Sequence, residues 1–218
     1  MKELEDVITY PMEQEDWVKT VIIGGVLIFL SFLIVPMFLV YGYLVRTIRG
    51  SLGDETEPPV FDEWGSLFVE GIQAWVIGLI YLIIPIIVMF MTVGTAVIAF
   101  ATGTESGAAA GFGSLFFGLG ITALLALIFG YVAVAGIVNF AREERFGAAF
   151  DIATLQQVLL NREFAIAFLV AIVIFIVASF VNAIPLIGWL LSPFVGFYAA
   201  IVAADLWADG FVAALAEA

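Results

Sequence analysis

The sequence contains no cysteine and no histidine, and its only lysines are Lys2 and Lys19. Without cysteine the chain can form neither disulfides nor thiol nucleophiles, and without histidine it lacks the commonest metal ligand and the commonest general base. Serine–histidine and cysteine–histidine catalysis are therefore excluded. We expect a protein that is not an enzyme, with no catalytic residue, no bound cofactor and no metal site.

Charge is also scarce and has mostly one sign. Charged residues make up 12% of the chain, and 20 Asp and Glu against 7 Lys and Arg give a formal net charge of −13. Acid-rich, lysine-poor surfaces tolerate their self-repulsion in molar salt, where the Debye length falls to about 3 Å. This pattern predicts a salt-loving source; the alternative is an ordinary protein with anionic loops. In either case nucleic acid is not an expected partner.

Hydrophobic residues are abundant, at 64% of the chain with a mean hydropathy of +1.17. A soluble domain of this length could not bury so much apolar surface. The apolar residues form continuous blocks, most of them near or above the roughly 20 residues that cross about 30 Å of hydrocarbon as a helix. The sequence therefore predicts an all-α, polytopic integral membrane protein with about five transmembrane helices, placed in the lipid bilayer of the cell membrane.

We expect a polar N-terminal segment, residues 1–16, before a single membrane domain, residues 17–218. The N-terminal segment has no basic stretch or small-residue cleavage site that would indicate a secretory signal. Pro36 lies inside the first helix and predicts a kink, with a re-entrant hairpin as the alternative. The helices are expected at about 17–45, 74–101, 114–141, 164–182 and 186–209.

Two further segments, 61–73 and 147–161, have one apolar and one polar helical face. In the first, Trp64 and Leu67 lie opposite Glu70, and this pattern is typical of a helix in the membrane interface. A helix that ends in two arginines, an amphipathic segment and a returning helix thus occur twice along the chain. The order suggests a tandem parallel repeat, with coincidental hairpin patterning as the alternative.

All five arginines of the chain fall in the two connections that carry these amphipathic segments. They are Arg46, Arg49, Arg142, Arg145 and Arg162. By the positive-inside rule both connections face the cytoplasm, and five crossings then place the N-terminus outside and the C-terminus inside.

These arginines, together with Trp64, are also the candidate contacts with lipid headgroups or a partner's carboxylates. The alternative is that they only set the topology. Asp205 lies near the inner end of the last helix, where a carboxylate is disfavoured unless water or a cation is close. It is read either as part of a solvated helix end or as a cation ligand.

The chain resembles a prokaryotic membrane family, the domain of unknown function 4013, which is frequent in halophilic archaea. The matching features are Tyr10-Pro11, Asp16-Trp17, Gly24-Gly25, Gly42-Tyr43-Leu44 with Arg46, Pro59, Phe61-Asp62-Glu63-Trp64-Gly65, Leu67-Phe68, Gly71, Tyr81 and Pro85. The resemblance implies a polytopic membrane protein. It implies no activity and no catalytic or binding residues.

We therefore expect a non-enzymatic scaffold or accessory subunit that acts through helix packing and its cytoplasmic amphipathic helices. Its partner would be another membrane protein or a second copy of the chain. The alternative is a small transporter or channel, suggested by the apparent repeat and by Pro36, Pro85 and Pro193 within the helices.

Overall fold

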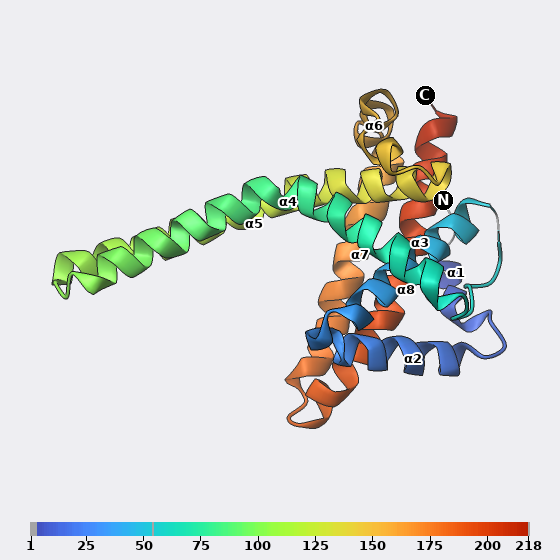
Figure 1. Cartoon of the computed structure of the whole chain (residues 1–218), viewed down its shortest axis with the longest axis horizontal. Coiled ribbons are helices and arrows are strands. Elements are labelled where there is room, and N and C mark those ends of the chain that lie inside the picture. Colours follow the sequence, from blue (N-terminus) through green and yellow to red (C-terminus); the bar gives the residue numbers. More distant parts are fainter. Residues whose placement is uncertain (1–3, 54, 218) are drawn as a thin grey trace. The chain divides into compact units, whose positions relative to one another are not determined.

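The computed structural model describes residues 4–53 and 55–217, which form helices and no strand (Figure 1). This confirms the all-α fold class. The α-helices are α1 (Leu4–Thr9), α2 (Trp17–Phe29), α3 (Val35–Leu52), α4 (Trp64–Ala101), α5 (Glu105–Glu143), α6 (Ile152–Leu159), α7 (Arg162–Ser179) and α8 (Ile187–Ala216). Short 3-10 helices are η1 (Tyr10–Met12), η2 (Ser31–Leu33), η3 (Phe146–Phe150) and η4 (Phe180–Ala183).

Among the described residues, 4 helical segments are long and apolar enough to cross a membrane: α4, α5, α7 with η4, and α8. This supports the expected membrane protein. The apolar helix α2 has 13 residues and is about 20 Å long, so it is shorter than the roughly 30 Å hydrocarbon core. The crossing predicted at 17–45 therefore begins with a helix that is too short to span the membrane.

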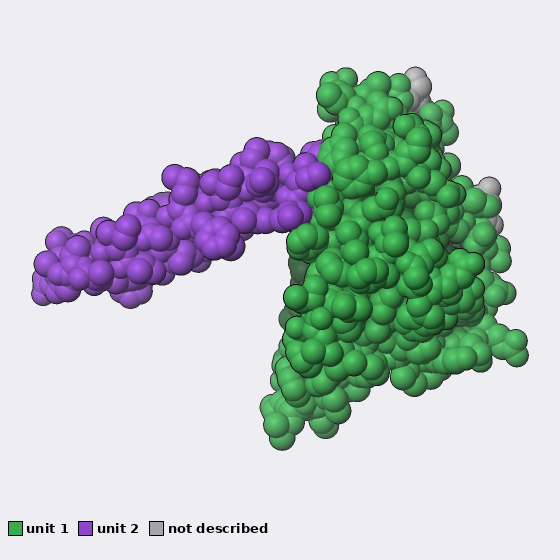
Figure 2. Space-filling model, in the orientation of Figure 1, with its two compact units in different colours: residues 1–77, 134–218 green, residues 78–133 purple. Residues whose placement is uncertain are grey.

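The chain divides into two compact units, residues 1–77 with 134–218 and residues 78–133 (Figure 2). Unit 2 is a helical hairpin made of the end of α4 and the beginning of α5. Its two helices pack closely where Gly111 meets Phe100 and where Gly118 meets Thr92. Large apolar side chains such as Phe116, which is 78% exposed, point away from this contact.

Unit 1 is organised around α8, against which α1, α2, α3 and α7 all pack. Small residues allow the close approach, because Gly24 and Gly25 of α2 face the rings of Phe197 and Phe194. The partners of α2 on α8 run from Tyr198, beside Trp17, back to Trp189, beside Phe29. The two helices therefore run in opposite directions along their contact, and α2 crosses α8 steeply (Figure 1).

The prediction of one kinked helix over 17–45 is wrong. Helix α2 ends at Phe29, the chain turns through η2, and Ile34 takes a left-handed φ of 67° before α3 begins at Val35. Pro36 lies in the first turn of α3, where its missing N–H and fixed φ are compatible with a helix. The proline thus starts a second helix instead of bending the first.

Other predicted boundaries also change. The amphipathic segment 61–73 becomes helical only at Trp64 and is continuous with the helix 74–101, so that both belong to α4. The helix at 114–141 extends to the whole of α5. The segment 147–161 is divided into η3 and α6, and the Asp151 carboxylate caps α6 by accepting from the Ala153 N–H. Because α5 is continuous where α2 and α3 are separate, the two halves differ here, and the tandem repeat stays a prediction.

Within unit 1, the N-terminal helix α1 packs against α8. Val7 contacts Val202 and Leu206 of α8, and the Tyr198 hydroxyl donates to the carbonyl of Ile8 at 2.6 Å. Helix α1 thus lies beside the C-terminal half of α8. Apolar residues within the polar 1–16 segment cause this return. The sides of the membrane on which the two ends of the chain lie stay a prediction.

Tyr10 continues this contact. Its hydroxyl accepts a hydrogen bond from Ser51 at the end of α3, at 3.3 Å. Burial raises the pKa of Tyr10 to about 12; the Ser51 hydrogen bond opposes the shift, while the negative charges of Asp205 and Glu55 add to it.

Candidate functional site

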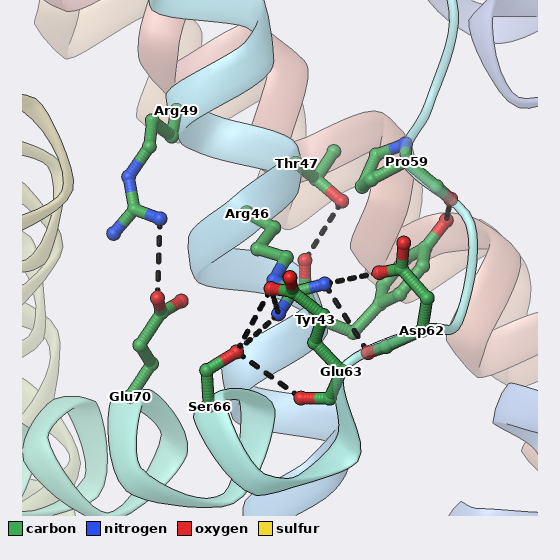
Figure 3. A network of polar contacts seen from close by, with 9 residues as sticks. All are labelled: Tyr43, Arg46, Thr47, Arg49, Pro59, Asp62, Glu63, Ser66 and Glu70. Carbon is green, nitrogen blue, oxygen red and sulfur yellow. Dashed lines mark hydrogen bonds and ion pairs between the residues drawn. The ribbon is translucent and has the colours of Figure 1, made fainter.

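The two arginines of α3 form the main polar site of unit 1, which we call the clamp (Figure 3). It consists of Arg46 and Arg49 with the side chains that bind or position them. Arg46 reaches the segment that precedes α4 and its first turn. Its guanidinium donates to the Asp62 carboxylate at 2.5 Å and to Glu63 at 3.2 Å, and also to the Ser66 hydroxyl. The Arg46 side chain is only 13% exposed, whereas the two carboxylates are mostly open to solvent.

Aromatic packing holds the carboxylates in reach of Arg46. Tyr43, one turn before Arg46 on α3, is fully buried, and its hydroxyl donates to the Pro59 carbonyl at 3.0 Å. Its ring stacks on Phe61 with centroids 4.2 Å apart, and Phe61 in turn stacks on Trp64. The segment between α3 and α4 is thus fixed from both ends, which reduces the entropy that the ion pairs must overcome.

Below the clamp the backbones of α3 and α4 touch. A Cβ on Gly42 would lie 1.9 Å from the carbonyl oxygen of Leu67, and one on Gly71 would lie 1.7 Å from that of Phe38. Glycine at both positions is what permits this crossing. The crossing sets the spacing at which Arg46 meets its partners.

Arg49 forms the second half of the clamp. Its Nη1 donates to Glu70 of α4 at 3.2 Å, and its Nε donates to the carbonyl of Ala141, in α5, at 3.3 Å. Glu144 lies 3.7 Å from the same guanidinium. The other oxygen of Glu70, Oε2, is buried and has no hydrogen-bond partner among the described residues. Arg49 therefore joins three segments of unit 1 through partly buried groups.

The remaining candidate residues lie outside the clamp, except Trp64, which is 46% exposed at its edge. Arg142 pairs with Glu143 at 2.7 Å and lies over the Phe211 ring, and Arg145 approaches the same carboxylate at 3.7 Å. Arg162 has no ion pair with any described residue. Contact with lipid or a partner stays a prediction for all six, and Arg46 and Arg49 already bind carboxylates of their own chain.

Asp205 does not lie in a solvated helix end, as one interpretation of the sequence had it, because the residue is 0% exposed. The described part of the chain holds no group of three or more acidic residues that could bind a metal ion. Among its cavities is an apolar one of about 590 Å³, lined chiefly by Leu169, Val173 and Val177 of α7 and by Val195 and Tyr198 of α8.

The sequence named the arginines but not their partners Asp62, Glu63 and Ser66. The resemblance to the family could have indicated these partners, because many of the residues on which it rests meet in the clamp or at the crossing of α3 and α4. A family model described as a protein of unknown function (DUF4013) matches residues 26–187, about three quarters of the chain. The chain belongs to this family. No curated protein and no solved structure matches it.

All clamp residues of this DUF4013 protein, from Tyr43 to Glu144, lie inside the matched range. The clamp binds positive to negative groups within one chain. These ion pairs and hydrogen bonds hold α3, α4 and the end of α5 together, which is a structural role.

Proposed function

We propose that this DUF4013 protein is a non-enzymatic membrane protein that acts by association, as a scaffold or an accessory subunit. The observation that carries the proposal is the outward surface of unit 2. Phe112, Phe116 and Phe117 are each about two-thirds or more exposed on a hairpin whose inner face is occupied by small residues. Lipid tails are as apolar as these rings, so in a bilayer such a surface binds a partner through close van der Waals packing with a complementary surface.

A second surface outside the long helices supports the same function. Ile152, on α6, and Leu160, directly after it, are 70% and 88% exposed. Helix α6 has 8 residues and is about 12 Å long, so it cannot span the hydrocarbon. Exposed apolar side chains on such a helix are typical of a surface that binds a partner or the membrane interface.

Mass measurement of the protein purified from its own membranes in mild detergent tests the proposal. We expect a protein mass per particle, without the bound detergent, that exceeds the 23.5 kDa of one chain. Phe116→Ala with Phe117→Ala should shift them toward the monomer, whereas Leu33→Ala, which removes exposed apolar surface from unit 1, should not. Wild-type protein that is monomeric and without a partner under these conditions would refute the proposal.

A transporter is the second candidate, favoured by the interrupted pair α2 and α3, since broken helices often line substrate paths. The apolar lining of the cavity between α7 and α8 argues against transport of a polar substrate through it. Uptake of a tracer ion into vesicles that contain the purified protein would favour transport over association.

We further propose a halophilic archaeal source and a cytoplasmic location for the clamp, from the acid-rich composition and the arginine positions. The unfolding temperature in detergent should then rise as potassium chloride increases from about 0.1 M to 1 M, since the Debye length falls from about 10 to 3 Å. An equal rise in a non-ionic osmolyte would show that charge screening is not the cause.

A further inference from the structure

Two turns lie together at one end of unit 1, and we call residues 30–35 and 180–190 the apolar tip. The first turn joins α2 to α3 and the second joins α7 to α8. Phe29 and Trp189 bring the two together, with ring centroids 5.6 Å apart. No charged residue occurs between Lys19 and Arg46 or between Glu163 and Asp205.

The tip exposes large apolar side chains where a loop in water would expose polar ones. Phe32 is 74% exposed, Phe180 69%, Leu186 90% and Trp189 70%. Exposure of such side chains to water is unfavourable relative to an apolar environment. The turn between α4 and α5 differs, since it contains Thr102, Thr104 and Glu105.

Several polar groups of the tip are hydrogen-bonded within the tip or to the adjoining helix turn. The Ile34 N–H donates to the Ser31 carbonyl at 2.9 Å, and the Ile187 N–H donates to the Pro185 carbonyl at 2.7 Å. The Ser31 hydroxyl donates to the carbonyl of Leu27, and the Asn182 amide donates to that of Ser179. Irregular backbone needs such internal bonds where no water is present.

Helix length gives the depth of the tip. Ile34 lies about 18 Å from Arg46 along α3, and α2 is about 20 Å long. Both lengths are well below the roughly 30 Å of the hydrocarbon core. Because Arg46 and its carboxylates need water or the headgroup region, the turn between α2 and α3 ends inside the bilayer.

We propose that the apolar tip is immersed in the acyl chains, so that α2 and α3 form a re-entrant hairpin whose partner is the hydrocarbon of the bilayer. The α7–α8 turn lies beside the hairpin, where Trp189 contacts Phe29, and it is immersed in the same acyl chains. This proposal is independent of the association function, because it concerns the solvent of the tip and not the surface of unit 2.

Single-cysteine labelling tests the proposal directly, since the natural chain has no cysteine. Ile34→Cys and Leu186→Cys would be treated with a charged maleimide in membrane fragments open on both faces. Thr56→Cys, on the exposed segment before α4, is the matched control. A thiol in hydrocarbon forms no thiolate, so both tip variants should label at least about tenfold more slowly than Thr56→Cys.

All three variants should label fully once the membranes are dissolved in denaturing detergent. Labelling of Ile34→Cys within about threefold of the control rate in intact fragments would overturn the proposal. Equal protection of the control would show only restricted access, so the fluorescence of Trp189 supplies a second test.

The Trp189 signal is the emission of the wild-type protein minus that of Trp189→Phe, in vesicles with brominated phospholipids. Bromine near the bilayer centre should quench this signal more than bromine near the headgroups, and aqueous iodide should have little effect. Strong quenching by iodide would place the tip in water. The mass of the purified assembly does not enter either test, so the two proposals can fail separately.

Discussion

Replacement of Gly71 by alanine places a methyl group 1.7 Å from the carbonyl oxygen of Phe38, and replacement of Gly42 places one 1.9 Å from that of Leu67. Real Cβ contacts essentially never fall below 3.0 Å. The obstacle is backbone in both cases, so no side chain can rotate away. The crossing of α3 and α4 must open by about 1 Å or more, which is larger than a well-packed interior tolerates.

We expect each single variant to lose about 2–3 kcal/mol of stability, the cost of overpacking a tight contact. For a chain of this size that loss lowers the unfolding temperature by roughly 5–10 °C. Because one separation relieves both clashes, the double variant should cost less than the sum of the singles. Gly65→Ala on α4 is the control, since a Cβ there meets nothing within 4 Å.

Thermal unfolding in detergent, followed by intrinsic tryptophan fluorescence, measures these shifts. The proposed backbone crossing would be refuted if Gly42→Ala and Gly71→Ala unfolded within a degree of the wild type. The same conclusion would follow if Gly65→Ala were equally destabilised, because the loss would then not depend on the crossing, and helix propensity by itself favours alanine over glycine.

Arg49→Gln should lose about 2 kcal/mol in the same assay, and adding Glu70→Gln should recover part of it, because the first change leaves a partly buried carboxylate without its cation; additive losses would contradict the pairing. Arg46→Gln should increase proteolysis between α3 and α4, measured by the rate of cleavage in the segment after Gly53, and an unchanged rate would show that the clamp does not hold it. For Tyr10, the folded pKa of about 12 exceeds the unfolded value of 10, so its contribution is complete below pH 10 and is lost as the pH rises from 10 to 12. Tyr10→Phe should therefore show a smaller fall in unfolding temperature over that range, and an identical fall would assign it to other groups.

The long helices were predictable because the thickness of the hydrocarbon imposes a minimum length that apolar runs reveal directly. Helix α4 was divided in the prediction because the face of residues 61–73 carries polar groups, yet nothing in that sequence ends a helix. Pro36 predicts a kink inside one helix, whereas the helix is interrupted before the proline at Ile34, since a proline fits the first turn of a helix better than its interior.

The clamp could be predicted only in part. Spacing along α3 puts Arg46 and Arg49 on one face, and it cannot say that they diverge to carboxylates on other segments. Nor does a periodic pattern reveal that Gly42 and Gly71 meet, because the contact depends on how two helices cross. The return of Val7 onto α8 was missed for the same reason, since it is a tertiary contact of a short polar segment.

The position of α8 at the centre of unit 1 imposes an order on biogenesis. The bonds of Arg46 join residues close in sequence and can form soon after α4 leaves the ribosome, whereas α1, α2 and α3 all pack against a helix that is synthesised long after them. During translation the glycine face of α2 must therefore remain in lipid or on an insertion factor until its permanent neighbour arrives. In a nascent chain arrested before α8, the clamp would have formed, whereas α2 and α3 would still lack the helix against which they pack.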